Sequence, residues 1–328
     1  MLNGRKRFIT ALSALAMAAA IGFVPGTAQA DPDIEDVESR VDRLYHEAEQ
    51  ASERYNDAKL ELTELERDLG AVEADEKRQD QRLAVVQEQV QEAVVRQYQG
   101  EGLSAMGQVV VSEDPQAFLS QLSTMSAFND YQDQLFSDYA REAKALDIRA
   151  RATQKRADEV AKIKDQLGRE KATIDKKLAE AQSLLDRLEA EERERMLASR
   201  SSTMRVPTNV PASGRAGAAV SYAMAQVGDS YSYGAAGPSS FDCSGLTMMA
   251  WAQAGVGLPH SSSAQYGSGP HIASGALQPG DLVFYYQPIS HVGMYIGNGA
   301  IVHAANPSTG VVVSGLYSMP YSGAVRPG

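Results

Sequence analysis

The chain has 328 residues, with 31 basic and 42 acidic side chains and a formal net charge of −11 at pH 7. The acidic excess lies in residues 31–213, which carry 26 basic and 39 acidic side chains, whereas residues 214–328 carry two and three. This charge argues against an anionic membrane surface as the main partner, and we expect no nucleic acid to bind. The single cysteine, Cys243, has no partner for a disulfide within the chain.

Residues 1–30 have the pattern of a secretory signal peptide. Arg5-Lys6-Arg7 precede a mostly apolar run from Phe8 to Val24, and Ala28-Gln29-Ala30 form a small-x-small cleavage site. The sequence therefore predicts a mature chain that begins at Asp31 and works in the secreted, periplasmic or cell-wall space. Retention as an uncleaved anchor is the minor alternative, because the run is short for a membrane span.

Residues 31–198 predict a long antiparallel helical hairpin, which we interpret as a coiled-coil regulatory domain. Apolar residues alternate at spacings of three and four from Ile34 to Val72, and a second such seam extends from Val160 to Leu188. Two lysines, Lys164 and Lys171, occupy core-type positions of the second seam. We expect them to weaken that stretch or to set its partner and register.

The predicted turn of the hairpin lies between the two seams. Gly100-Glu101-Gly102 and Pro115 are helix-ending signals, so the chain should return through residues 118–198. Residues 100–128 then form a small apolar cap. Its apolar side chains either contact another protein or only pack the cap: Phe118, Leu122, Met125 and Phe128.

Residues 199–213 lack periodicity and contain two prolines, which is typical of a linker. The separate domain that follows spans residues 214–328. Its first helix is expected over residues 217–227.

A second helix is predicted from Cys243 to a stop at Gly255, with Asp242 as its N-cap. Leu246 and Trp251 are expected in the core. A cysteine in the first turn lies beside the partial positive charge of the helix N-terminus, which favours the reactive thiolate. We therefore expect Cys243 to be a nucleophile, and a buried inert cysteine is the alternative.

Two histidines flank a predicted β-hairpin. The strand candidates at residues 291–296 and 300–304 are joined by Gly297-Asn298-Gly299. His291 and His303 face the same side only if the loop has an odd number of residues or a bulge supplies the odd one. A three-residue loop pairs Ile296 with Ala300 and makes the histidines diagonal neighbours. His291 would then accept the proton of Cys243, while His303 orients it.

These motifs resemble the NlpC-type cysteine peptidases, papain-like enzymes that cut the peptide stems of bacterial peptidoglycan. The resemblance covers nearly all of residues 217–305, through seven matching pieces: Gly228–Gly234, Phe241–Leu246, Leu258–Ser261, Gln265, Gly280–Val283, His291–Gly297 and Val302–Ala304. The sequence departs from the family at Gly234-Ala235-Ala236, where a second glycine is usual.

The resemblance implies an α+β fold, in which the cysteine-bearing helix packs on an antiparallel sheet. It also implies roles for the site residues. Cys243 is the nucleophile, His291 the base and His303 the third polar residue, while Tyr231 stabilises the oxyanion together with the Cys243 N–H. Asp242 and Ser244 would line the cleft. Three residues are further candidates for substrate binding: His260, Ser261 and Gln265.

The resemblance makes the expected partner a peptidoglycan stem peptide, cut between D-glutamate and the diamino acid. No cofactor is expected, nor a metal, because no carboxylate cluster is visible beside the paired histidines. Two other functions stay open: a catalytically silent activator or scaffold of wall hydrolases, and an amidase or acyltransferase on the same scaffold. His46 is expected to be solvated.

The helical half resembles, more loosely, the coiled-coil domains of exported cell-wall hydrolases, which are activated by a membrane complex of the division or elongation machinery. We hypothesise that this half blocks the cleft until such a partner moves it.

Overall fold

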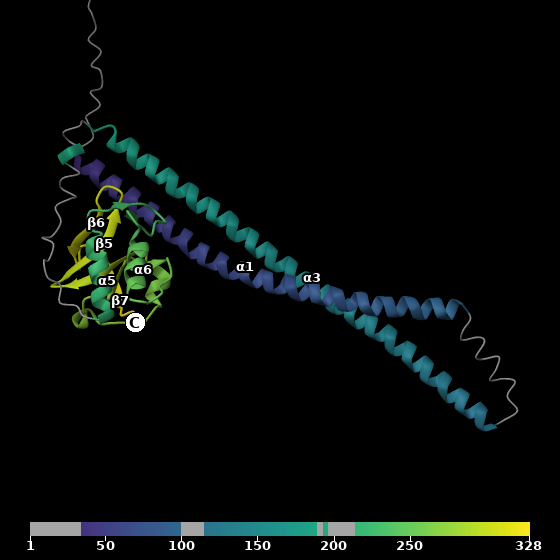
Figure 1. Ribbon diagram of the computed structural model, residues 1–328. Helices are drawn as coiled ribbons and strands as arrows, with labels where there is room; N and C mark the ends of the chain where they lie inside the picture. Colours follow the sequence, from purple (N-terminus) through teal and green to yellow (C-terminus); the bar gives the residue numbers. More distant parts are fainter. Residues whose placement is uncertain (1–33, 100–114, 189–192, 196–213) are drawn as a thin grey trace, which may run out of the picture.

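The computed structural model describes residues 34–99, 115–188, 193–195 and 214–328. The predicted signal peptide and linker, and most of the predicted cap, lie outside these residues. The part that the structure describes falls into a long helical hairpin and a small mixed domain that packs against one end of it (Figure 1).

The hairpin consists of α1 (Ile34–Tyr98) and α3 (Pro115–Leu185). Side-chain ion pairs between them show that they are antiparallel, because the number on α3 falls as that on α1 rises. Glu47 pairs with Lys177 at 2.7 Å, and Asp75 pairs with Arg149 at the same distance. The predicted helical hairpin is confirmed.

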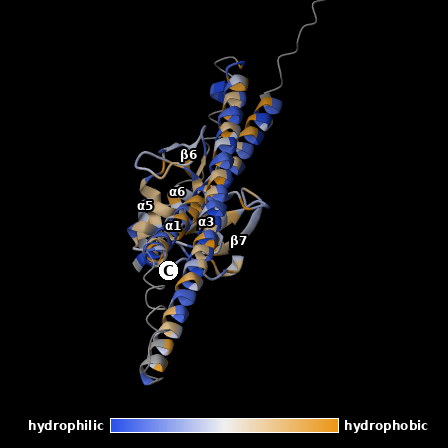
Figure 2. Cartoon of the chain, turned by 90° about the vertical axis from the view of Figure 1, so that its right-hand side faces the viewer, coloured by the Kyte–Doolittle hydropathy of each residue, from blue (hydrophilic) through white to orange (hydrophobic). Residues whose placement is uncertain are grey.

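The proximal end of the hairpin has an apolar seam. Val37, Val41 and Leu44 of α1 pack on Ala181 and Leu185 of α3. Figure 2 shows polar and apolar residues interspersed along the outer surfaces of both helices. The seam therefore stabilises the hairpin through a narrow stripe rather than a wide core.

The two lysines of the second seam are largely exposed. Lys164 reaches Glu66 of α1 at 2.9 Å, and Lys171 pairs with Asp175 of its own helix at 3.1 Å. The predicted cap is wrong over residues 115–128, because these residues belong to α3. The helix begins three residues before the predicted start of the returning segment at residue 118. No helix among the residues that the structure describes has the length and apolar character to cross a membrane.

The mixed domain is built on a five-stranded antiparallel sheet of order β6-β5-β4-β3-β7. Its strands are β3 (Leu282–Tyr285), β4 (His291–Gly297), β5 (Ala300–Asn306), β6 (Gly310–Gly315) and β7 (Tyr321–Val325). A separate parallel pair, β1 (Ser230–Tyr231) and β2 (Ser240–Phe241), leads into the cysteine helix.

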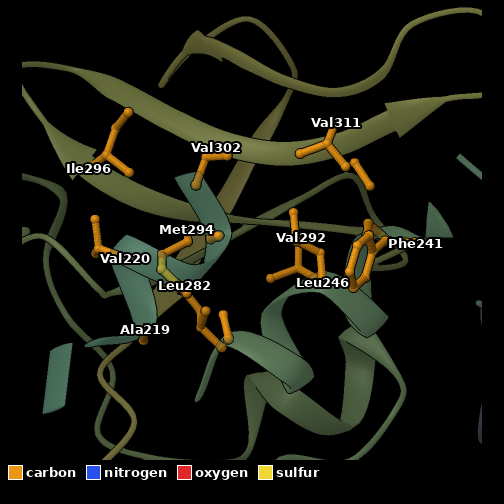
Figure 3. Close-up of a cluster of buried hydrophobic side chains, with 14 of the residues drawn as sticks. Ala219, Val220, Phe241, Leu246, Leu282, Val292, Met294, Ile296, Val302 and Val311 are labelled. Carbon is orange, nitrogen blue, oxygen red and sulfur yellow. The ribbon is translucent and has the colours of Figure 1, made fainter. Parts of the chain in front are cut away.

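Helices α5 (Gly214–Ala225) and α6 (Cys243–Gln253) pack against β4 and β5, and a one-turn helix, α7 (Ser262–Tyr266), lies beside them. A short 3₁₀ helix spans Ser274–Ala276. Figure 3 shows the core between the helices and the sheet, with Val220, Leu246 and Met294 among its side chains. The predicted α+β fold, with the cysteine helix on an antiparallel sheet, is confirmed.

Helix α6 begins and ends through local chemistry that the sequence predicts. The Asp242 carboxylate accepts a hydrogen bond from the Gly245 N–H at 2.6 Å, as an N-cap does. Gly255, two residues after the helix, has a φ of +73°, a conformation that glycine adopts without strain. Leu246 and Trp251 are buried in the core as expected.

The hairpin of β4 and β5 satisfies the parity condition through a bulge. Met294 pairs with Val302 and Tyr295 with Ile301, but Gly297, not Ile296, pairs with Ala300. The three-residue loop is therefore wrong: the turn has two residues, and Ile296 is the extra residue of the bulge. His291 and His303 still face the same side, as predicted.

Candidate active site beneath a helix

The Cys243 thiol lies in the first turn of α6 and is fully buried. His291, the first residue of β4, lies next to this thiol and is also buried. The Cys243 Sγ, a ring nitrogen of His291 and a carboxylate oxygen of Glu49 all lie within 4.8 Å of one another. The structure thus brings the predicted nucleophile and base together, with a carboxylate that belongs to α1.

A chain of hydrogen bonds holds the two histidines in place. His291 Nε2 lies 2.7 Å from His303 Nδ1, and His303 Nε2 lies 2.9 Å from Ser314 Oγ on β6. Burial and the neighbouring His291 hold the pKa of His303 well below its usual value, so its ring is neutral. The network then fits an Nε2–H on His291 that donates to His303, which leaves His291 Nδ1 as the atom that can exchange a proton on the Cys243 side.

Glu49 of α1 occupies that position. Its Oε1 lies 2.5 Å from His291 Nδ1, which therefore carries a proton and donates it to the carboxylate. Burial alone would raise the pKa of Glu49, but the charge of His291 and its hydrogen bond hold that pKa below the ordinary value. An ionised carboxylate therefore stands where the Cys243 thiolate would pair with His291.

Glu53, one helical turn further along α1, lies against the nucleophile. Its Oε1 is 3.7 Å from Cys243 Sγ and accepts a hydrogen bond from Ser244 Oγ at 2.9 Å. The other oxygen, Oε2, accepts from the N–H and the Oγ of Ser262 on α7. The side chain is thus fully engaged inside the site.

Further contacts seat α1 on the domain along the same face. Asn56 Nδ2 donates to Asp242 Oδ2 at 3.3 Å, and Asp57 accepts from the hydroxyls of Ser261 and Ser263. The Tyr45 carbonyl accepts from the Tyr233 hydroxyl at 3.0 Å. Helix α1 therefore covers Cys243 from one side of the site to the other.

The expected stabilisation of the thiolate is wrong for this arrangement. Burial raises the pKa of Cys243 well above its usual value, and the negative charges of Glu53, Glu49 and Asp242 raise it further. The partial charge of the helix N-terminus does not offset the loss of water and three nearby carboxylates. In the structure, Cys243 is a neutral thiol.

Tyr231, the predicted oxyanion donor, is buried near the site. Burial raises the pKa of its phenol well above the ordinary value, and Glu49 and Cys243 raise it further. The hydroxyl therefore stays protonated and able to donate. Its ring packs edge-on against Tyr233 at 4.9 Å between centroids.

Of the other predicted site residues, Ser244 and Ser261 face α1. Asp242 is instead a positioning residue, because its carboxylate is buried and accepts from the Gly234 N–H at 2.9 Å as well as from the Gly245 N–H of α6. Gln265 does not fit a substrate-binding role. It is fully buried, and its amide bonds the carbonyls of Ser244 and Pro259 and the hydroxyl of Thr247.

The three remaining histidines have neighbours. His260 Nε2 lies 2.8 Å from Asp242 Oδ1; burial would lower its pKa, but Asp242 raises it above the ordinary value. His271 stacks on Tyr266 at 4.4 Å. The expectation that His46 is solvated is wrong, because its ring lies 4.0 Å from that of Tyr286 and its Nδ1 lies 3.7 Å from Glu49.

The α1 carboxylates are the site residues that the sequence interpretation missed. Its premise that no carboxylate joins the histidines is wrong, since Glu49 does. A signal was present: Glu49, Glu53 and Asp57 follow one another at a spacing of four, which repels in an isolated helix. We call these three residues the acidic stripe.

Comparison with known proteins identifies the domain that contains these residues. The model of the NlpC/P60 family matches residues 228–325. These residues form an NlpC/P60 domain. The match begins just before Tyr231 and ends at the last residue of β7, so it contains Cys243, His291 and His303.

Curated relatives of the NlpC/P60 domain are named probable endopeptidases. One from Corynebacterium glutamicum is 43% identical over 116 residues, which are 35% of this chain and 56% of that protein. One from Mycobacterium tuberculosis is 50% identical over 88 residues, 27% of this chain and 23% of that protein. This chain thus spans about half of the first relative and less of the second.

Solved structures similar to the NlpC/P60 domain include that of the peptidoglycan hydrolase SagA. It is 31% identical, with a TM-score of 0.32, and the match covers 34% of this chain and 97% of that domain. RipA, titled a resuscitation promoting factor interacting protein, is 33% identical with a TM-score of 0.33, over 34% of this chain and 61% of that one.

Proposed function

We propose that this protein is a peptidoglycan endopeptidase that cleaves wall stem peptides by thiolate catalysis. The observation that carries the proposal is the arrangement of Cys243, His291 and His303 within an NlpC/P60 domain. A nucleophile, a base and an orienting group in hydrogen-bonded order are what covalent acyl transfer requires.

The chemistry needs α1 to leave the site. Cys243 then loses its proton, and its thiolate pairs with the protonated Nδ1 of His291, while the Nε2–H stays bonded to His303. The thiolate attacks an amide carbonyl, and the Tyr231 hydroxyl and the Cys243 N–H stabilise the oxyanion in this proposal. His291 protonates the leaving amine, and water hydrolyses the thioester. The proposed bond is that between D-glutamate and the diamino acid, the usual choice of the family that the sequence resembles.

Incubation with defined stem peptides tests the activity. Mass spectrometry should show a new amino terminus on the diamino acid, and Cys243→Ala should lower the rate by a factor of about a thousand or more. Binding without cleavage by the protein from which α1 has been released would favour a scaffold. Transfer to an added amine would favour an acyltransferase, and release of ammonia an amidase.

The regulatory part of the proposal is that α1 inhibits the enzyme. Support comes from the side chains of α1 that contact His291, Ser244 and Ser262, together with the burial of Cys243. A thiol with no exposed surface cannot reach a wall peptide. Release of α1 should therefore precede catalysis, which the experiments below test.

Export and activation by a membrane complex complete the proposal. The pattern of residues 1–30 supports export to the wall space, where the substrate lies. Large apolar side chains exposed near the distal end of the hairpin, such as Leu122 and Phe128, are candidates for a docking surface for an activator that acts in wall growth or division. Pull-down of membrane proteins by the wild-type chain, but not by Leu122→Glu/Phe128→Glu, tests this proposal.

A further inference from the structure

The acidic stripe lies along the site from His291 to Ser261. Glu49 faces His291, Glu53 faces Cys243 and Ser262, and Asp57 faces Ser261. We infer that α1 is a proton-dependent clamp, so that its release from the active site discharges protons and is favoured as the pH rises. This inference rests on the proposed inhibition by α1 and concerns what controls it.

Glu53 is the first group that exchanges a proton. It is 4% exposed, and the charged or titratable groups around it come from every element packed there: Glu49 and Asp57 of α1, Asp242 and Cys243 at the start of α6, His260 before α7 and His291 on β4. Ser244 and Ser262 donate to its oxygens. Burial and the charge of Asp242 nonetheless raise the pKa of Glu53 to about 7.

The raised pKa of Glu53 determines how closure depends on pH. On released α1, Glu53 would be exposed and titrate near the ordinary value of 4.5. Because its pKa is higher in the closed form, the closed form holds the extra proton. The stabilisation that this proton gives to closure is fully present below about pH 4.5 and is lost as the pH rises to about 7.

Cys243 adds a second proton in the same direction. With α1 in place, His291 Nδ1 already carries a proton, which it donates to Glu49, and Cys243 remains a thiol because burial and Glu53 raise its pKa. With α1 gone, the thiolate can pair with protonated His291. The closed set therefore holds a proton on sulfur that the open ion pair does not, and opening releases it to solvent.

Glu49 opposes this trend only in acid. Its pKa is lowered in the closed form, so its contribution to closure is present above about pH 4.5 and is lost as the pH falls through the lowered value. Closure should therefore be strongest near pH 5. Between pH 5 and 8 the proton release of Glu53 and Cys243 dominates.

Hydrogen exchange at the Ser262 amide of the full chain measures the clamp directly. This N–H lies in the first turn of α7, where no acceptor exists within the helix, and it donates to Glu53 Oε2. After correction for the intrinsic exchange rate at each pH, its protection should fall by roughly tenfold or more from pH 5 to pH 8.

Glu53→Gln keeps a side-chain oxygen that can accept from Ser262 but removes the titration. Its protection should change less than threefold over the same range. Glu64→Gln, at an exposed position of α1, is the matched control and should follow the wild-type profile. A flat corrected profile in the wild type, or an unchanged slope in Glu53→Gln, would overturn the proton linkage while leaving inhibition intact. An amide unprotected at every pH would overturn inhibition itself, and neither outcome bears on stem-peptide cleavage.

Discussion

The proximal and distal ends of the hairpin use the same helical pattern for different purposes. Near the proximal end, α1 is buried on two sides, by α3 at Val41 and by the NlpC/P60 domain at Glu53. Towards the distal end the helices separate (Figure 1), and large apolar side chains lie exposed, among them Val95, Leu122 and Phe128.

The two ends differ in the side chains that lie outside the apolar seam. A heptad pattern predicts that a helix packs against another, but it does not say which side chains outside the seam are buried. At the proximal end these are carboxylates that face a catalytic set, and at the distal end the exposed residues are apolar. We therefore propose that the proximal end inhibits the enzyme and that the distal end binds a partner.

Substitution of both Glu49 and Glu53 should have the largest effect on the proximal end. In Glu49→Ala/Glu53→Ala, closure loses its bonds to His291 and Ser262, and two of the three carboxylate charges that raise the pKa of Cys243 are gone. Alkylation of this single cysteine by iodoacetamide at pH 7, followed by mass spectrometry, should accelerate by roughly a hundredfold. Glu64→Ala/Glu73→Ala, at exposed positions of the same helix, should react at the wild-type rate. Equal rates in the two double variants would refute the role of the proximal end.

A matched pair of valine substitutions compares packing at the two ends. Val41 is fully buried in the seam, whereas Val95 is about half exposed. Val41→Ala should lower the free energy of unfolding by about 1–3 kcal/mol, and Val95→Ala should change it by less than about 0.5 kcal/mol. Denaturant unfolding followed by helical circular dichroism checks both values. Similar losses would mean that the distal end is packed as tightly as the proximal one.

Asn56→Ala should have a smaller effect on the clamp. It removes the hydrogen bond to Asp242 at the edge of the α1 contact, which is worth about 1–2 kcal/mol to closure because one partner is charged. Cys243 alkylation should accelerate by roughly five- to thirtyfold, at about 1.4 kcal/mol per factor of ten. Thr63→Ala, which removes only a hydroxyl bonded to the carbonyl of Lys59 in the same helix, is the control. No acceleration would show that this edge contact does not hold α1.

The smallest effect is expected at the distal end. Because Leu122 and Phe128 are exposed, Leu122→Ser/Phe128→Ser should leave the unfolding free energy within about 0.5 kcal/mol of the wild type and Cys243 alkylation unchanged. Denaturant unfolding and iodoacetamide alkylation measure these two quantities. A change in thiol reactivity would show that the distal surface already controls the site without a partner.

Much of the site could be predicted because its determinants are local. The N-cap at Asp242 and the parity of the strands that carry His291 and His303 both follow from short stretches of sequence. The bulge at Ile296 was one of the two stated ways to satisfy that parity, though the specific loop was wrong.

The protonation state of Cys243 could not be predicted in the same way. The pKa of Cys243 is raised by burial and by the charges of Glu53 and Glu49, which lie about 190 residues earlier in the chain. On a polar helix face these carboxylates look solvated, and only docking of α1 on the NlpC/P60 domain buries them. A helix N-terminus therefore indicated the nucleophile correctly but gave the wrong direction for its pKa.

One measurement tests the central claim most directly. A protease site inserted between residues 199 and 213 allows the folded full chain to be cut and the hairpin removed, and the cleavage of a defined stem peptide is then followed before and after. If α1 inhibits the enzyme, the rate should rise by roughly a hundredfold on removal of the hairpin, and the same chain carrying Cys243→Ala should stay inactive in both forms. An intact chain that cleaves as fast as the released domain would contradict inhibition by α1.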